Sequence, residues 1–185
     1  MKTKKSAPEV NAGSMADIAF LLLIFFLVTT TMANDKGIQR KLPRLCPPGE
    51  NCSIDIHERN ILRISLNGNQ EIMVQDDIIE IDELKNMVKS FVDNNGDSSC
   101  TYCNGFKDAT SSDNPSKAVV SLQSHSQASY ESFIKVQDEL TKAYLELRKA
   151  YAKNVLGKSL DDLDEKDMDL LKKAYPFIIS EAQTK

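Results

Sequence analysis

The chain has 185 residues, of which 41% are hydrophobic and 27% are charged, and its formal net charge is −4 at pH 7. This length suits one ordinary domain with accessory segments and is too short for a barrel enzyme of about 250 residues. The acidic balance argues against a nucleic-acid partner. Two histidines and no tryptophan leave little material for histidine catalysis or base stacking.

The N-terminus combines a basic leader with an apolar segment. Residues 1–13 carry Lys2, Lys4 and Lys5, and residues 14–33 are almost entirely apolar. A helix of that length covers about 30 Å, the hydrocarbon thickness of a bilayer. The sequence therefore predicts one transmembrane helix, and the lysines predict a cytoplasmic N-terminus by the positive-inside rule.

A cleaved secretory signal peptide is the alternative interpretation of this segment. The leader is suitably basic, and Thr31–Ala33 is an acceptable small-residue cleavage site. However, the apolar run is long for a signal core, and Asp17 near its start costs up to about 3 kcal/mol on the insertion scale. We expect a retained helix, with a secreted, disulfide-stapled binding domain as the alternative.

Asp17 is the only charged residue between positions 14 and 33. Burial in hydrocarbon disfavours an ionised carboxyl, so that protonation and conformation become coupled, and such acids are functional by default. The alternative is an interfacial residue whose side chain reaches the headgroups. Helical spacing places Leu21, Ile24, Val28 and Thr31 on the face of Asp17, which makes this face a candidate proton path.

An extracytoplasmic linker is expected over residues 34–60, which contain three prolines and many charges. Cys46 and Cys52 lie in this linker, and Cys100 and Cys103 lie in a later loop. An even number of cysteines on the oxidising side of a membrane favours disulfides, and all three pairings are open. Four thiolates binding zinc are the alternative, but the spacing is a loose match and we expect no metal.

Residues 61–185 are expected to form one α+β domain. Alternating apolar residues predict strands, an Asn67-Gly68 turn predicts a hairpin, and apolar residues at helical spacing predict helices. The predicted order is ββαβααβ, an open sheet with helices on one face. Strands are expected at 62–66, 72–74, 118–123 and 177–179, and helices at 81–92, at 133–151 with a stop at Gly157, and at 159–175.

Other polar residues of the domain do not suggest catalysis. The acidic run from Asp161 to Asp169 lacks the glycine and terminal glutamate of a calcium loop, so we expect a solvated helix face. His57 and His125 have no nucleophile or carboxylate partner that the sequence identifies. We expect neither enzyme activity nor a cofactor.

Four features occur in an order that resembles the ExbD/TolR family of biopolymer transport proteins. They are Met15-Ala16-Asp17-Ile18 running into the apolar span, Leu42-Pro43 in the linker, the Leu66-Asn67-Gly68 turn, and Tyr130 after the strand at 118–123. Together they cover most of the chain, and the span is the most specific of them. The loop at 95–116 and the helix after Gly157 extend the compact family domain.

The resemblance implies a single-pass subunit of a bacterial inner-membrane motor, with a periplasmic C-terminal domain. Such subunits form a dimer of helices inside a ring of polytopic ExbB-like subunits, expected to be a pentamer, in contact with membrane lipid. Asp17 aligns with the family's essential membrane aspartate, which the resemblance implies is protonated and released as the ring rotates. Leu42 and Pro43 match a linker pair that contacts a partner, although a plain tether is an equal alternative.

The resemblance also implies which process the proton motive force drives. In ExbD-type systems the proton motive force is passed to a TonB-like protein that drives outer-membrane uptake. In the TolR branch the same mechanism serves envelope integrity and contact with peptidoglycan. We expect the ExbD-type output, with the TolR-like output as the alternative.

Overall fold

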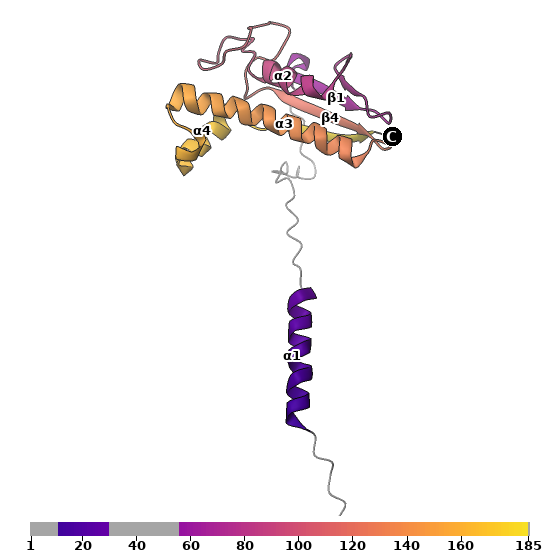
Figure 1. Ribbon diagram of the computed structural model, residues 1–185. Helices are drawn as coiled ribbons and strands as arrows, with labels where there is room; N and C mark the ends of the chain where they lie inside the picture. Colours follow the sequence, from indigo (N-terminus) through magenta and orange to yellow (C-terminus); the bar gives the residue numbers. More distant parts are fainter. Residues whose placement is uncertain (1–10, 30–55, 185) are drawn as a thin grey trace, which may run out of the picture. The chain divides into compact units, whose positions relative to one another are not determined.

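The computed structural model describes residues 11–29 and 56–184 of the chain. They belong to two units, one within residues 1–52 and one within residues 53–185, which are described separately. Figure 1 shows the first as the single helix α1 and the second as a sheet with helices.

Helix α1 runs from Ala12 to Thr29. Asn11 caps its start, since the Asn11 side chain accepts a hydrogen bond from the Gly13 N–H at 3.0 Å. Its 18 residues span about 27 Å. In the described part of the chain, α1 is the one helix long and apolar enough to cross a membrane. Its side chains are all exposed, as expected for a helix that buries its surface against lipid or other subunits.

The domain is built on a five-stranded mixed sheet with the order β3-β2-β1-β4-β5. Strand β1 (Ile61–Leu66) is parallel to β4 (Val119–His125), and β4 is parallel to β5 (Ile179–Thr184). Strands β2 (Ile72–Val74) and β3 (Asp77–Ile79) continue the sheet beyond β1 in antiparallel fashion. Because parallel neighbours need long connections, the chain between them forms helices.

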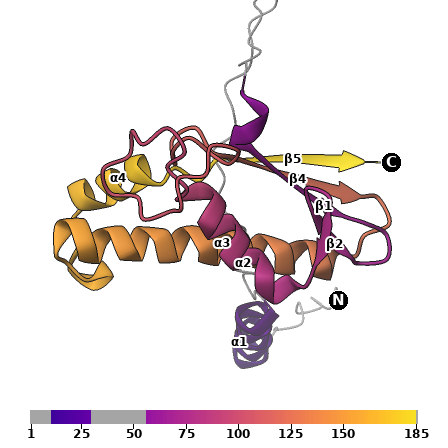
Figure 2. The same ribbon diagram turned by 90° about the horizontal axis from the view of Figure 1, so that it is seen from above.

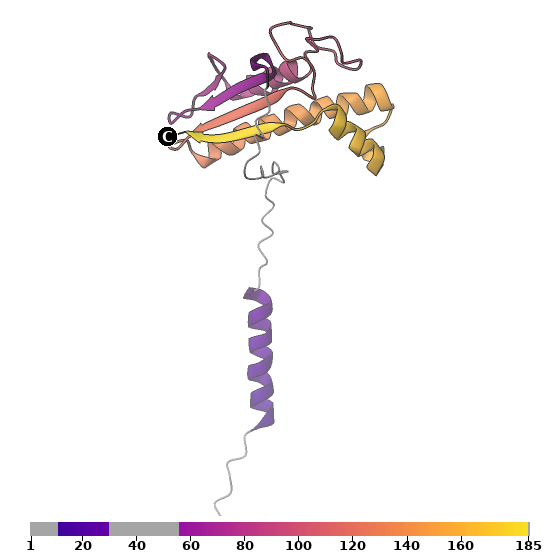
Figure 3. The same cartoon turned by 180° about the vertical axis from the view of Figure 1, so that it is seen from behind.

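Three helices accompany the sheet. Helices α2 (Ile81–Val92) and α3 (Tyr130–Tyr151) pack against each other and lie on the same side of the strands (Figure 2). Helix α4 (Glu165–Ala174) contacts α3. Seen from behind, strands β1, β4 and β5 have no α-helix of the described residues over them, so α2 and α3 cover only the opposite face of the sheet (Figure 3).

The core lies between the sheet and the two long helices. In β1, Leu62, Ile64 and Leu66 are buried and alternate with more accessible residues, because successive side chains of a strand point to opposite faces. The helices contribute apolar residues at a spacing of three and four, which places them on one helical face. The buried residues of α2 and α3 are Leu84, Val88, Phe91, Val92, Val136, Gln137, Leu140, Ala143, Tyr144 and Leu147.

The predicted fold class is confirmed, with one added strand. The observed order is βββαβααβ, because the three residues of β3 pair with β2 through a tight turn at Gln75 and Asp76. Gln75 has φ 56°, in the left-handed region. Ile78 in this strand is 65% exposed, so β3 shows no apolar alternation from which the sequence could predict it.

The chain after α3 differs from the prediction in detail. Helix α3 ends at Tyr151 and continues as a wider turn of π type, Ala152–Leu156, which Gly157 closes at φ 66°. The helix predicted at 159–175 is divided into a 3₁₀ turn, Leu160–Asp162, and α4.

A capping box explains the start of α4. The Asp164 carboxylate accepts a hydrogen bond from the Asp167 N–H at 2.7 Å, and the Asp167 carboxylate accepts one from the Asp164 N–H at 3.2 Å. Asp167 also pairs with Lys158 and is 9% exposed. The expectation of a fully solvated acidic face is therefore wrong for Asp167, which is a structural residue.

Two leucines of α3 give a matched test of this packing. Leu140 is fully buried, whereas Leu145 is 53% exposed on the same helix. We predict that Leu140→Ala lowers the free energy of unfolding by about 2–5 kcal/mol, because it leaves a cavity between α3 and the sheet. Leu145→Ala should change it by less than about 0.5 kcal/mol. Chemical denaturation of the detergent-solubilised chain measures both, and equal effects would contradict the observed orientation of α3.

Candidate functional site

Asp17 lies in the second turn of α1 and is the only charged residue of that helix. Its carboxyl group is exposed, with the small residues Gly13 and Ala16 close by on the same part of the helix. Small side chains allow a neighbouring helix to approach closely. The site therefore offers one ionisable group at a place where another helix can reach it.

The predicted face of α1 lies in part within the described residues. Leu21, Ile24 and Val28 follow Asp17 at spacings that put all four side chains within about 60° of one another around the helix axis. Thr31 lies outside the described residues, as do Leu42, Pro43, Cys46 and Cys52. The Thr29 hydroxyl donates a hydrogen bond to the Phe25 carbonyl at 2.8 Å, so it is engaged by the backbone of its own helix.

The arrangement has a simple chemical consequence. A lone carboxyl on an apolar helix is stable in hydrocarbon when it is protonated, and when ionised it needs a polar or charged partner. Among the described residues, no three histidine, cysteine, aspartate or glutamate side chains are grouped so that they could hold a metal ion. Within α1, Asp17 is therefore the one side chain that can carry a charge.

A second polar site lies where the chain enters the domain. We call Arg59, Asn60, Asp113 and Lys117 the entry cluster. Asp113 is at its centre, with 3% of its side chain exposed. It accepts hydrogen bonds from the Asn60 amide at 3.1 Å and the Lys117 ammonium at 3.3 Å, and it pairs with the Arg59 guanidinium.

The entry cluster joins two distant parts of the chain. Asn60 immediately precedes β1, and its side-chain oxygen accepts a hydrogen bond from the Asp113 N–H at 2.8 Å, in the loop that leads to β4. The cluster thus fixes the starts of two neighbouring parallel strands. Sequence reasoning missed the entry cluster, because Asn60 and Asp113 are 53 positions apart and neither residue lies in a recognisable motif.

Hydrogen bonding controls the charge of Asp113. Burial by itself would raise the pKa of this carboxyl, but the hydrogen bonds from Asn60 and Lys117 and the charge of Arg59 outweigh burial. The pKa of Asp113 therefore lies below its usual value, and the carboxylate stays ionised in the folded domain.

A shallow hollow lies next to the entry cluster. It has a volume of about 520 Å³ and includes the backbone segment just before β1. His57 is on its rim and is exposed, and His125, at the other end of the sheet, accepts a hydrogen bond from the Gln127 N–H at 3.2 Å. The residues around the hollow are Ile56, His57, Asn60, Ser116, Lys117, Val119 and Ile178.

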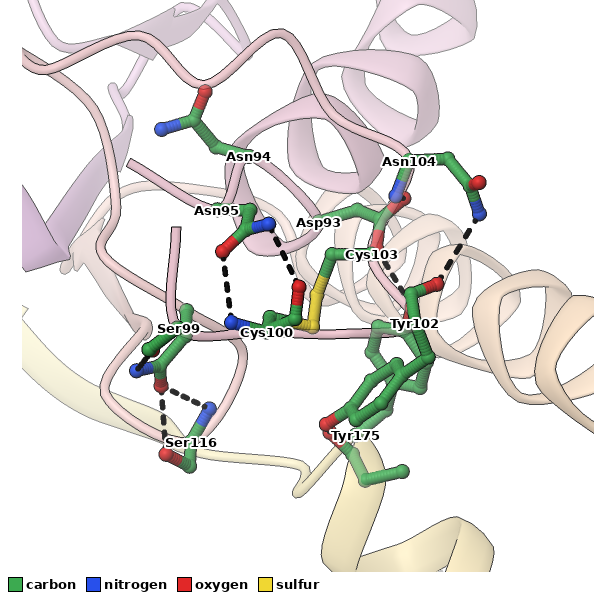
Figure 4. The surroundings of a disulfide bond; sticks show 12 residues. Asp93, Asn94, Asn95, Ser99, Cys100, Tyr102, Cys103, Asn104, Ser116 and Tyr175 are labelled. Carbon is green, nitrogen blue, oxygen red and sulfur yellow. Dashed lines mark hydrogen bonds between the residues drawn. A yellow bond between two sulfur atoms is a disulfide. The ribbon is translucent and has the colours of Figure 1, made fainter. Parts of the chain in front are cut away.

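Cys100 and Cys103 are joined by a disulfide in the loop between α2 and β4 (Figure 4). Cysteines in a disulfide cannot serve as thiolate ligands, so this arrangement does not fit a zinc site built from all four thiolates. The bond lies at the ends of three helices, far in sequence from the residues of α1.

Comparison with known families identifies one match. The model of the family described as biopolymer transport protein ExbD/TolR matches residues 3–150. The match includes all of α1 with Asp17, the linker, and the domain nearly to the end of α3. No curated protein matches the sequence closely enough to be taken as a relative.

The entry cluster generates a pH-dependent prediction. Asp113→Ala should lower the free energy of unfolding at neutral pH by about 1–3 kcal/mol, because it leaves the buried Asn60 amide without its acceptor. Since the pKa of Asp113 is lowered in the fold, its contribution is present above about pH 4 and is lost as the pH falls further. The variant should therefore lose less stability on acidification than the wild type.

Denaturation midpoints measured between pH 7 and pH 2.5 provide the test. Asp169→Ala is the matched control, because Asp169 is exposed and pairs with Lys172 only at 3.8 Å. If Asp113→Ala and Asp169→Ala gave the same acid profile, the role assigned to the entry cluster would be wrong.

Proposed function

Because the chain belongs to the ExbD/TolR family of biopolymer transport proteins, we propose that it is the single-span subunit of an inner-membrane motor driven by the proton motive force. Members of this family take part in energy transduction for biopolymer transport and are not enzymes. The finer assignment is to an ExbD-type subunit that energises TonB-dependent transport across the outer membrane.

The observation that carries the proposal is the single carboxyl of α1. Asp17 is the only ionisable side chain in this helix. One elementary charge moved across 100 mV releases about 2.3 kcal/mol. A carboxyl that is neutral against lipid and ionised against a polar partner can convert that energy into a change of helix position.

The extent of the family match supports an anchored chain. It begins at residue 3 and continues through α1 into the domain, so the apolar helix belongs to the matched region. If the apolar segment were a cleaved signal peptide, we would not expect one family model to match it together with the domain. The lysines of the leader support a cytoplasmic N-terminus and therefore a periplasmic domain.

Helix α1 is apolar and exposed along its whole length, which is consistent with partners on more than one side. We propose that the face with Asp17, Leu21 and Ile24 meets an ExbB-like ring, expected to be a pentamer, and a second copy of α1, while the remaining surface meets lipid. In the linker, Leu42 and Pro43 are the proposed contact with a partner. A TonB-like protein is the proposed recipient of the motion.

The central test is Asp17→Asn in the native host. Asparagine keeps the size and polarity of the side chain but cannot exchange a proton, so proton-gradient-dependent uptake should fall to the level of a deletion strain. Ser14→Asn, which adds an amide one turn earlier and leaves Asp17 in place, should retain uptake. Immunoblotting of membranes checks that both variants are present at wild-type levels.

The outcomes separate the competing functions. Loss of uptake only in Asp17→Asn supports the ExbD-type assignment. Normal uptake with a leaky envelope, together with binding of the domain to isolated peptidoglycan, would favour the TolR-like output. If Asp17→Asn had neither defect, Asp17 would be an interfacial residue and the motor proposal would be wrong.

A further inference from the structure

The loop between α2 and β4 contains a ring of four residues closed by the Cys100–Cys103 disulfide. The ring holds one large side chain, Tyr102. A cross-link across so short a segment removes little entropy from the unfolded chain, so its contribution to overall stability is small. We therefore expect the disulfide to matter mainly because it fixes the position of Tyr102.

Tyr102 lies between the C-terminal ends of α3 and α4. Its ring centroid is 5.0 Å from that of Tyr151 and 5.5 Å from that of Tyr175, both in edge-to-face geometry. Its hydroxyl donates a hydrogen bond to the Ala174 carbonyl at 2.8 Å, at the last residue of α4. Burial raises the pKa of Tyr102, so this hydroxyl remains a donor at neutral pH.

The base of the ring is fixed to the segment that follows α2. The Asn95 side chain, which is buried, accepts from the Cys100 N–H at 2.9 Å and donates to the Cys100 carbonyl at 2.8 Å. Gly105 lies so close to the end of α2 that an added Cβ would be 2.2 Å from the Asp93 carbonyl oxygen. As Figure 4 shows, the ring thus bridges the end of α2 and Tyr175.

Two further contacts hold the same end of α4 without the ring. The Tyr175 hydroxyl donates to the Asp93 carboxylate at 2.6 Å, and Arg148 donates to the Tyr175 carbonyl at 2.7 Å and 3.0 Å. Strand β5 follows directly and pairs only with β4, at the edge of the sheet. Because these contacts remain when Tyr102 is lost, we expect its loss to loosen α4 and β5 locally and to leave the rest of the domain folded.

We propose that the Cys100–Cys103 disulfide is a redox-sensitive clamp that holds α4 and β5 on the domain through Tyr102. Both cysteines are partly exposed, so a dithiol can reach them. A thiolate of the dithiol attacks one cysteine sulfur and expels the other cysteine as a thiolate, which leaves a mixed disulfide. The second thiol of the dithiol then attacks its own sulfur in that mixed disulfide and expels the first cysteine. Cys100 and Cys103 gain two electrons and two protons, the dithiol becomes a disulfide, and Tyr102 is released from its fixed position.

Hydrogen exchange of the full chain in detergent tests the clamp. In Cys100→Ser/Cys103→Ser, amide exchange over residues 165–184 should rise on the order of tenfold, while exchange in β1 stays at the wild-type rate. Tyr102→Ala should reproduce the effect with the disulfide intact. Wild-type protein titrated with a dithiol should show the same local increase, which provides a second route if the serine variant folds poorly.

Cys46→Ser/Cys52→Ser is the matched control, because it removes two cysteines and leaves the ring in place. It should exchange like the wild type over residues 165–184, and a dithiol should still accelerate exchange there. Unchanged exchange in this segment after reduction of the Cys100–Cys103 bond would overturn the proposal. A uniform increase that includes β1 would also overturn it, because the bond would then be a general stabiliser.

Discussion

The carboxyl of Asp17 imposes the constraint on which the proposed mechanism depends. On the insertion scale an aspartate at the centre of a helix costs about 2.5–3.5 kcal/mol, whereas each leucine, isoleucine, phenylalanine or valine contributes about 0.3–0.6 kcal/mol in the opposite direction. Helix α1 has enough of these side chains to offset one acid. It can therefore remain in the membrane in either charge state, and the two states favour different surroundings. In the proposed mechanism, that difference is what allows a proton gradient to do work on the helix.

The domain has a continuous apolar core and a firm tie between two neighbouring strands. Its apolar residues face α2 and α3, and the starts of β1 and β4 are tied together by Asp113. Strand β1 is held to β4 at six paired positions, from Ile61↔Val119 to Leu66↔Ser124. Strands β3 and β5 form the two edges of the sheet in the described part of the chain.

Elements with a regular apolar period could be predicted from sequence. Helix α1 and the helix over 81–92 were found, because a long uncharged run and a spacing of three and four residues are properties of consecutive positions. Strand β3 was missed, because three residues with an exposed Ile78 carry no alternation. The break before α4 had a local signal, since Asp164 and Asp167 have the spacing of a capping box.

The contacts that join distant parts of the chain could not be predicted. Asp113 is polar and surrounded by turn residues, a pattern that usually indicates an exposed loop. In the fold it is buried, and it contacts Asn60, which is distant in sequence. Tyr102 was overlooked for the same reason, since its hydrogen-bond partner Ala174 is 72 positions away. Asp17 could be proposed from the sequence alone, because the signal of a charge in an apolar segment is entirely local.

Chemical labelling of Asp17 in native membranes tests the central claim most directly. A hydrophobic carbodiimide reacts with protonated carboxyls in apolar surroundings, and mass spectrometry of the α1 peptide measures the labelled fraction. The account predicts that Asp17 is labelled, and that the labelled fraction changes when a protonophore collapses the gradient at constant external pH. An Asp17 that is never labelled, or is labelled equally with and without the gradient, would contradict a proton-coupled role.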